Sequence, residues 1–288
     1  MLEALQKSAE FLAKKGVDSP RLQAELLLGH VLGVARMRLY LDFERVLTAP
    51  QVDRYRELIR RRGQREPLQQ ITGSASFCGL EIRLNRAVLV PRPETELLAE
   101  AGWTLLQAQT RERAGDKTPL AALDFGTGSG CIAIALAVKC PDAQIYALDA
   151  SAEALSVARQ NAAAHGVGER IEFLLSQGLG ALSPELRFDL IVGNPPYIPS
   201  AEIEQLQPEV RDFEPRLALD GGPDGLTYYR QIAAEAKPFV SPGAKVLLEF
   251  GDGQETAIEA IFRDQNWIVE GFTPDYTQRP RILVARRP

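Results

Sequence analysis

Two kinds of hydrophobic pattern divide the chain. Through about residue 63, apolar residues recur at helical spacing, as Leu22 and Leu26 do on one predicted face. Residues 71–92 instead contain two short stretches in which apolar and polar positions alternate, which predicts a β-hairpin. This stretch ends at Pro91-Arg92-Pro93, where the prolines favour extended backbone. The first third of the chain is therefore expected to hold helices followed by a hairpin.

From residue 93 onward, apolar runs of strand length alternate with helical patterns. The expected strands are residues 120–125, 144–149, 171–175, 188–193, 244–250, 267–272 and 281–285, and the helices between them include 131–139, 152–164 and 225–236. Apolar strands flanked by helices are typical of a parallel sheet that is covered on both faces. The prediction is an α/β fold: a Rossmann-like, seven-stranded, mostly parallel sheet over 93–288, a small all-helical N-terminal domain over 1–70, and a β-hairpin linker over 71–92.

A glycine-rich loop follows the first predicted strand of this sheet. Gly126, Gly128 and Gly130 alternate with Thr127 and Ser129, at the sheet edge where such folds bind cofactors. Glycine lets the backbone turn tightly and approach a ligand closely. The G-x-G-x-G spacing differs from the G-x-G-x-x-G of dinucleotide sites, and the chain has no G-x-x-x-x-G-K-[ST] loop. The loop therefore favours a nucleoside with an amino-acid tail, and disfavours a nicotinamide-dependent dehydrogenase or an NTPase.

An aspartate ends the next predicted strand. Asp149 follows Gly130 by 19 residues, where a carboxylate can accept hydrogen bonds from both hydroxyls of a ribose. Each hydrogen bond to a charged group is worth about 1.5–3 kcal/mol. The alternative is that Asp149 caps the following helix, but Ser151 is available for that role. The ribose role is the favoured interpretation.

The fourth predicted strand leads into Asn194-Pro195-Pro196-Tyr197 at the same edge of the sheet. The Asn194 side-chain oxygen and the Pro195 carbonyl can each accept one N–H of a planar NH2 group. Consecutive prolines fix the backbone, so these acceptors are held in place before the substrate arrives. The Tyr197 ring can lie against the planar group and exclude water. A plain loop would explain the prolines in isolation, but their place after a glycine-rich loop favours catalysis.

These motifs carry a family resemblance. Asn194 to Tyr197 resembles the motif of N-methyltransferases that act on adenine, cytosine and glutamine amide nitrogens. The wider pattern resembles the release factor glutamine methyltransferases, through the helical N-terminal domain, the hairpin, and the segments 91–96, 123–130, 147–155, 193–199, 213–226 and 248–251. The resemblance implies methyl transfer from S-adenosylmethionine to the N5 nitrogen of the glutamine in the Gly-Gly-Gln motif of peptide-chain release factors.

The resemblance also implies roles for particular residues. It assigns the cofactor to Gly126, Thr127, Gly128, Ser129, Gly130, Asp149, Gln177, Gly178 and Asn194, the glutamine to Asn194, Pro195, Pro196 and Tyr197, and catalysis to Asn194, Pro195 and Tyr197. Arg92, Glu94 and Glu96 are expected near the same pocket, with no role assigned. One departure concerns the adenine: where the family often has an acid and an aromatic residue, this chain has Ser176-Gln177-Gly178. Gln177 can still accept a hydrogen bond from the adenine amino group through its side-chain oxygen.

Charge bears on the choice of partner. The 288 residues carry a net charge of −5, yet residues 1–90 hold 15 Lys and Arg against 10 Asp and Glu. This basic region could dock an acidic partner or nucleic acid, although the run Arg60, Arg61 and Arg62 is explained equally well as a solvated helix face. A net-acidic chain without a long basic stripe is a poor match for phosphates. A nucleic-acid amino-group methyltransferase (adenine N6 or cytosine N4) thus remains the alternative.

Other features narrow the setting. The three cysteines show no C-x-x-C spacing and the two histidines lie far apart, so neither a disulfide framework nor a metal site is expected. No run approaches the ~20 apolar residues of a membrane span, and the amphipathic, acid-containing N-terminus matches neither a signal nor a transit peptide. A cytoplasmic enzyme is expected. A non-catalytic adaptor with the same fold is disfavoured, because Asp149 and Asn194 are both present.

Overall fold

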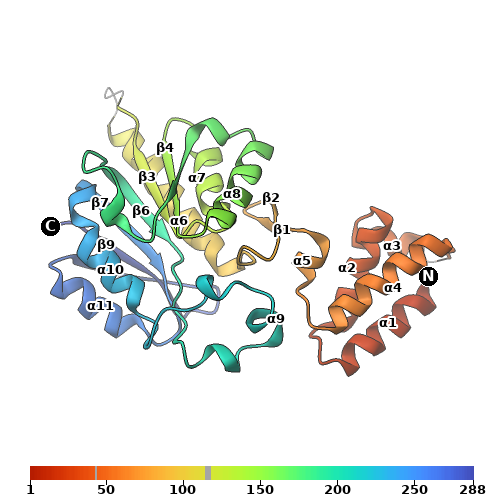
Figure 1. Ribbon diagram of the computed structural model, residues 1–288. Helices are drawn as coiled ribbons and strands as arrows, with labels where there is room; N and C mark the ends of the chain where they lie inside the picture. The colour runs from red at the N-terminus through yellow and green to blue at the C-terminus, as the bar shows by residue number, and fades with distance from the viewer. Residues whose placement is uncertain (43, 114–117) are drawn as a thin grey trace. The chain divides into compact units, whose positions relative to one another are not determined.

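The computed structural model describes residues 1–42, 44–113 and 118–288. It divides into two compact units: a helical unit of Met1–Ser74 with Leu206–Phe213, and a sheet unit of Ala75–Gln205 with Glu214–Pro288 (Figure 1). Within the described ranges, no helix is long and apolar enough to cross a membrane.

The helical unit is built from short amphipathic helices around one small core. Its helices are α1 (Leu2–Lys14), α2 (Pro20–Leu32), α3 (Arg36–Leu41), α4 (Ala49–Gly63), α5 (Leu68–Thr72) and α9 (Pro208–Arg211). Leu12, Leu27, Leu28 and Leu58 are fully buried between them, whereas Leu22, which the sequence placed on the apolar face of α2, is 38% exposed. The segment 206–213 joins this unit although it lies far along the chain, and no pattern in the sequence indicated this.

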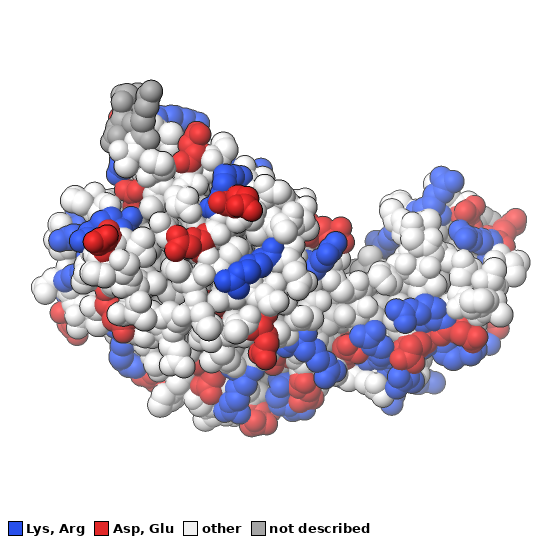
Figure 2. Space-filling view, turned by 45° about the horizontal axis from the view of Figure 1, so that its top comes forward, with Lys and Arg blue, Asp and Glu red and all other residues white. Residues whose placement is uncertain are grey.

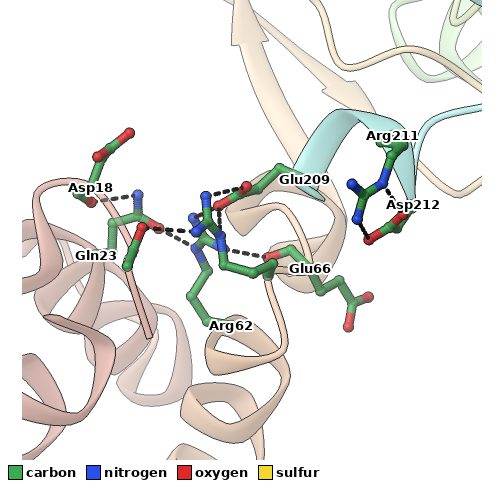
Figure 3. Close-up of polar contacts among 9 residues, drawn as sticks. Asp18, Gln23, Arg62, Glu66, Glu209, Arg211 and Asp212 are labelled. Atoms are coloured by element: carbon green, nitrogen blue, oxygen red, sulfur yellow. Dashed lines mark hydrogen bonds and ion pairs between the residues drawn. The ribbon is translucent and has the colours of Figure 1, made fainter. Parts of the chain in front are cut away.

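An ion-pair network holds that segment within the helical unit. Arg62 and Arg65 both donate to Glu209 on α9, at 2.6–2.7 Å, and Arg62 is only 4% exposed (Figure 3). Arg60 pairs with Glu57 at 2.8 Å, and Arg61 pairs with Glu66 at 2.6 Å. Each arginine of the run 60–62 therefore forms an ion pair with an acidic side chain. Basic and acidic side chains are also interspersed on the face that Figure 2 shows.

The sheet unit contains the predicted seven-stranded sheet. Its strands are β3 (Ala121–Phe125), β4 (Gln144–Asp149), β5 (Ile171–Leu175), β6 (Phe188–Gly193), β7 (Val240–Glu249), β8 (Ile268–Pro274) and β9 (Pro280–Arg286). Their order is β5-β4-β3-β6-β7-β9-β8, and only β9 runs antiparallel to its neighbours. The predicted fold class is thus confirmed. The strand order reverses beside β3, where open α/β sheets bind ligands.

Helices cover both faces of this sheet (Figure 1). The helices of this unit are α6 (Pro93–Glu112), α7 (Cys131–Lys139), α8 (Ala152–Ala164), α10 (Thr227–Glu235) and α11 (Glu255–Asp264), with 3-10 turns at Gly168–Arg170, Leu179–Ala181, Ile203–Gln205, Arg216–Ala218 and Lys237–Phe239. Leu190 and Val192 of β6 pack in the core under α6, α7 and α8, whereas Ile191 packs in the core under α10 and α11. Alternation along each strand therefore fills two separate cores, as both-face coverage requires.

The hairpin is shorter than the predicted linker. Strands β1 (Ser74–Phe77) and β2 (Leu80–Arg83) form it, and residues 84–92 contain no strand. Arg92 is extended, with φ −101° and ψ 148°, and Pro93 is the first residue of α6. Proline is well suited to that first position because its fixed φ fits a helix and its missing N–H would have no partner there.

Candidate active site

The glycine loop between β3 and α7 is held tightly against β4. The N–H groups of Gly126 and Thr127 both donate to the carbonyl of Leu148, at 2.9 Å each. Gly126 and Gly128 have φ of 72° and 55°, and a Cβ added to Gly126 would meet no atom within 4 Å. The backbone is thus bare where it faces open space. A ligand can approach this stretch more closely than any side chain would permit.

A buried aspartate supports the loop from beneath. Asp124 is fully buried, and its Oδ2 accepts from the Thr127 hydroxyl at 2.6 Å and from the Ala133 N–H at 3.1 Å. Burial raises the pKa of Asp124 to about 7, although these two hydrogen bonds oppose the shift. Thr127 is therefore a structural residue of the loop, because its hydroxyl is directed inward at Asp124.

Asp149 joins the end of β4 to the same loop. Its Oδ2 accepts from the Gly128 N–H at 2.8 Å, and its Oδ1 accepts from the Ser151 N–H at 2.9 Å. The helix α8 is capped by Ser151, whose hydroxyl accepts from the Ala154 N–H at 3.1 Å. Burial raises the pKa of Asp149, while its backbone hydrogen bonds lower it. Because Ser151 supplies the side-chain cap, Asp149 is left with carboxylate lone pairs that can accept from a ligand.

A cavity of about 280 Å³ opens beside these groups, near the lower end of the ~300–1,000 Å³ usual for small-molecule sites. Among the residues predicted from the sequence, those on its wall are Gly126, Gly128, Asp149, Gln177, Asn194 and Pro196. They come from the ends of three neighbouring parallel strands and from the turn after a fourth. The structure therefore brings the glycine loop, the strand-end aspartate and the Asn-Pro-Pro-Tyr segment together around one space.

The other predicted residues lie behind this wall. Gly130 has φ 83°, and a Cβ there would come within 3.0 Å of the Ala158 Cβ. The Ser129 carbonyl accepts from the Asn161 side chain at 2.9 Å. A Cβ on Gly178 would lie 2.1 Å from the Gln231 Nε2, so this glycine lies close against a side chain of α10. These three residues shape the loops that the cavity residues occupy.

Two residues of the Asn-Pro-Pro-Tyr segment also lie behind the wall. Pro195 is buried, and the Tyr197 ring packs against the core under α10 and α11. The Tyr197 carbonyl accepts from the Gln254 Nε2 at 2.9 Å, and burial raises the pKa of the Tyr197 hydroxyl to about 12. Tyr197 therefore anchors the segment in this structure, and its ring does not form part of the cavity wall.

Several wall residues were missed by sequence reasoning. Tyr228 of α10 lies on the wall, with its ring edge-to-face against Phe125 at a centroid distance of 6.3 Å. Residues 86–89, Pro215, Leu217 and Ala218 also contribute to the wall. The 86–89 stretch is positioned by the hairpin, because the Arg83 backbone exchanges hydrogen bonds with the Asn161 side chain of α8, at 2.9 and 3.0 Å. Loop residues of this kind carry no periodic signal, so they could not be found from the pattern.

Arg92, Glu94 and Glu96, which the resemblance placed near the pocket, are not among the residues of the cavity wall. Arg92 donates to Glu214 at 2.6 Å, and Glu96 accepts from the Cys78 N–H at 3.0 Å. Burial raises the pKa of Glu214, and the charge of Arg92 opposes that shift. The Arg92–Glu214 pair thus ties the start of α6 to the chain just before the wall residues Pro215, Leu217 and Ala218.

A hydrogen-bonded chain runs inward from the cavity through Asn194. The Asn194 Nδ2 donates to the Thr95 hydroxyl oxygen at 3.1 Å, and that hydroxyl donates to the Glu249 Oε2 at 2.7 Å. Thr95 and Glu249 are 3% and 2% exposed. Glu249 ends β7, and Thr95 lies in the first turn of α6. Both residues fall within segments that the sequence analysis quoted, but no role was given to either.

The residues of the cavity fit S-adenosylmethionine. Bare backbone at Gly126 and Gly128 offers room for an amino-acid tail, and the Asp149 carboxylate lies at the position suited to ribose hydroxyls. Tyr228 and Leu148 provide apolar surface on the same wall. A wall that combines apolar surface with a few polar groups is typical of sites for small molecules.

Comparison with known proteins agrees with this picture. The family model for the PrmC N-terminal domain matches residues 3–73, and the model for the methyltransferase small domain matches residues 102–208. Curated proteins called release factor glutamine methyltransferase are similar over most of the chain. The one from Chlorobaculum tepidum is 48% identical over 252 residues, which is 86% of this chain and 84% of the relative. The one from Koribacter versatilis is 39% identical over 286 residues, which is 99% of this chain and 98% of the relative.

Solved structures agree on the fold. The hMettl16 catalytic domain, determined in complex with a 3'UTR hairpin, aligns with a TM-score of 0.54 and 14% identity, covering 83% of this chain and 81% of that one. A methyltransferase from Pyrococcus furiosus aligns with a TM-score of 0.50 and 20% identity, covering 73% and 90%. At such low identity, these likenesses concern the fold alone.

Proposed function

The chain belongs to the release factor glutamine methyltransferase family and is an S-adenosylmethionine-dependent methyltransferase, and from this premise we propose how its residues act. The target is the N5 nitrogen of the glutamine in the Gly-Gly-Gln motif of a peptide-chain release factor, in the cytoplasm. The observation that carries this proposal is the placement of Asn194 on the wall of the cavity that Gly126, Gly128 and Asp149 also line. The acceptor for an NH2 group and the cofactor loop thus share one space.

Asn194 and Pro195 select and orient the amide. The Asn194 Nδ2 is directed at Thr95, which leaves Oδ1 to accept one N–H of the glutamine. The other N–H is assigned to the carbonyl of Pro195, which lies just behind the wall between the wall residues Asn194 and Pro196. With both hydrogens held, the nitrogen lone pair is directed out of the amide plane. Hydroxyls and thiols lack the second hydrogen, so they are disfavoured.

S-adenosylmethionine supplies a methyl group bonded to a positively charged sulfur. The glutamine nitrogen forms the new bond to that methyl carbon as the carbon–sulfur bond breaks, and the sulfur keeps the electron pair. The positive charge moves to the nitrogen, which then loses a proton to solvent. The residues of the chain accelerate this step chiefly by orienting the amide and excluding water. Asp149 binds the ribose, and Gln177 accepts a hydrogen bond from the adenine amino group.

Mass analysis of the product tests the proposal. An intact release factor is incubated with the enzyme and methyl-labelled S-adenosylmethionine, digested, and analysed by tandem mass spectrometry. One added methyl group should lie on the side-chain nitrogen of the Gly-Gly-Gln glutamine. Label in RNA or DNA, with none on that glutamine, would contradict the proposal.

The helical unit is proposed to dock the release factor. A single glutamine side chain offers little surface for recognition, whereas standard protein interfaces bury ~1,200–2,000 Å². Arg60, Arg61 and Arg62 are each paired with an acidic side chain. They therefore do not form the run of free positive charge that would support nucleic acid as the partner of this unit.

A further inference from the structure

We propose that Thr95 and Glu249 are positioning residues that determine which end of the Asn194 side-chain amide faces the substrate. This inference rests on the proposed role of Asn194 in binding the glutamine. It concerns two buried side chains to which neither the motifs nor the resemblance assigned a role. The observation behind it is the continuous chain Asn194–Thr95–Glu249, with links of 3.1 and 2.7 Å.

The oxygen and nitrogen ends of the asparagine side-chain amide have nearly the same shape, but only the oxygen can bind the substrate NH2 group. Oδ1 can accept an N–H from the substrate, whereas Nδ2 would oppose the substrate NH2 with hydrogens of its own. A rotation of about 180° about the last side-chain bond exchanges the two ends without moving other atoms. The protein therefore needs a partner that distinguishes them. Thr95 is the residue placed to do so.

Thr95 alone could not make that choice, because a hydroxyl both donates and accepts. A carboxylate can only accept, so the Glu249 Oε2 takes the single proton of the Thr95 hydroxyl. The Thr95 oxygen is then left with lone pairs and must accept from Asn194. This forces Nδ2 inward and Oδ1 toward the cavity. Glu249 therefore acts on the substrate through two intervening side chains.

The surroundings of the chain make this choice effective. Thr95 and Glu249 are 3% and 2% exposed, so water is not available to provide an alternative partner. In such surroundings an unmatched polar group destabilises the arrangement, because no water replaces the lost partner. The backbone of Glu249 is fixed separately, since its carbonyl accepts from the Tyr229 hydroxyl at 2.7 Å.

The first test compares Thr95→Val, Thr95→Ser and Trp267→Phe in the full-length enzyme. Thr95→Val removes the acceptor, so kcat for release factor methylation should fall about tenfold, while the KM for S-adenosylmethionine stays within about twofold. Thr95→Ser keeps the hydroxyl and should restore most of kcat. Trp267→Phe is the control: it removes a buried hydrogen bond, from the Trp267 Nε1 to the Ala233 carbonyl at 2.8 Å, away from the cavity wall, and should lower Tm without lowering kcat.

A double mutant decides whether Thr95 acts through Asn194. If it does, adding Thr95→Val to Asn194→Ala should slow methylation no further, because the amide to be oriented is already gone. The inference would be overturned if Thr95→Val kept the full kcat, or if the loss of rate in the double mutant equalled the sum of the losses, in free energy, of the two single mutants. The proposed function is judged separately, by whether the wild-type enzyme methylates the release factor at all.

The acid–base behaviour of Glu249 provides a second, independent readout. Burial raises its pKa to about 7, while the Thr95 hydrogen bond and the charges of Arg281 and Arg92 lower it and Glu94 raises it. The Tyr197 and Tyr229 hydroxyls are titratable groups that also interact with Glu249, and the Tyr229 hydroxyl donates to its backbone carbonyl. Protonated Glu249 can donate to Thr95, so the preference for one amide orientation disappears. The single-turnover rate should therefore fall as the pH drops from about 8 to 6.

Glu249→Gln separates this effect from other titrations, since glutamine cannot lose or gain a proton in that range. Its rate should be independent of pH between about 6 and 8, with Thr95→Val behaving likewise. If the fall toward acid pH persists unchanged in Glu249→Gln, another group is responsible and the positioning role of Glu249 is overturned.

Discussion

At the scale of single residues, the same residue types serve two distinct purposes in this site. Gly126 and Gly128 leave backbone bare beside the cavity, whereas Gly130 has φ 83° and lies against Ala158. The sequence motif treats these glycines alike, because it records only spacing. Which of them faces a ligand depends on residues of other elements, such as Ala158. Site residues could be predicted from the sequence as a group, but not individually.

Asn194→Ala should isolate the catalytic contribution of the amide. The variant keeps the cofactor loop and Asp149, so we expect the affinity for S-adenosylmethionine to change by less than about threefold. The methylation rate should fall ~10²–10³-fold, the usual cost of removing one preorganised polar contact at a reacting centre. Single-turnover kinetics with an intact release factor measures this. Near wild-type turnover would remove Asn194 from the mechanism.

Asp149→Ala should act on cofactor binding. The ribose would lose two charged hydrogen bonds, each worth about 1.5–3 kcal/mol, so the Kd for S-adenosylmethionine should rise at least ~100-fold. The loop would also lose the acceptor for the Gly128 N–H. Titration calorimetry gives the Kd, and Ser151→Ala, which removes the cap of α8, is the matched control for loss of stability. An unchanged Kd with an early melting transition would show that Asp149 has a structural role only.

At the scale of elements, the predicted strand bounds agree with the structure at the parallel strands. The runs 144–149, 171–175 and 188–193 coincide with β4, β5 and β6, and β6, which is buried along its whole length, is the clearest case of a strand covered on both faces. Helix α6 is less apparent from the pattern, since its first turn carries Pro93, Glu94 and Glu96. Those residues favour a helix N-terminus, yet they also occur in loops.

The attachment of α9 to the helical unit lay beyond the sequence pattern. It depends on Glu209 and two arginines that are more than 140 positions away in the chain. Charge pairing over such separations leaves no periodic signal. The consequence is that residues 206–213, downstream of the Asn-Pro-Pro-Tyr segment, are held by α4.

Glu209→Gln should show how strongly this attachment is stabilised. Arg62 would be left buried without its opposite charge, so the free energy of unfolding should fall by about 3 kcal/mol. Glu57→Gln, which breaks the exposed Arg60 pair on the same helix, is the control and should cost under about 1 kcal/mol. Chemical denaturation of the two variants provides the comparison. Equal losses would show that the buried network contributes no more than a surface pair.

The pH dependence of the same variant follows from the pKa of Glu209. Burial would raise that pKa, but the hydrogen bonds from Arg65 and Arg62 lower it below the ordinary value of 4.5. A carboxyl with a lowered pKa in the folded state stabilises the protein above its unfolded pKa, and this stabilisation is lost as the pH falls through the folded value. Wild type and Glu209→Gln should therefore differ most near neutrality, and the difference should shrink as the pH falls below 4.5 and through the lowered folded pKa.

At the scale of the whole molecule, the chemistry and the choice of partner are separable. The sheet unit contains every residue of the cavity wall, so it determines that a planar NH2 group is methylated. An adenine or cytosine amino group satisfies the same geometry. What distinguishes the partners must therefore be read from a larger surface than the cavity. The charge pattern of the helical unit, in which Arg60, Arg61 and Arg62 are all paired, favours a protein surface over a phosphate backbone.

Intact release factor should accordingly be a far better substrate than a short peptide that contains Gly-Gly-Gln. Both present the same glutamine and the same flexible glycines, so the two values of kcat should agree within about tenfold. The peptide lacks the remaining surface, and its KM should be at least ~100-fold higher, because most of a standard protein interface is missing.

Raising the salt concentration from 50 to 200 mM should change kcat/KM for the release factor by less than tenfold. A nucleic acid bound through 6–10 phosphates would instead lose ~10³–10⁵ in affinity over that range. Equal KM values for peptide and intact factor would remove the need for a docking surface, and a steep salt dependence would favour the nucleic-acid alternative.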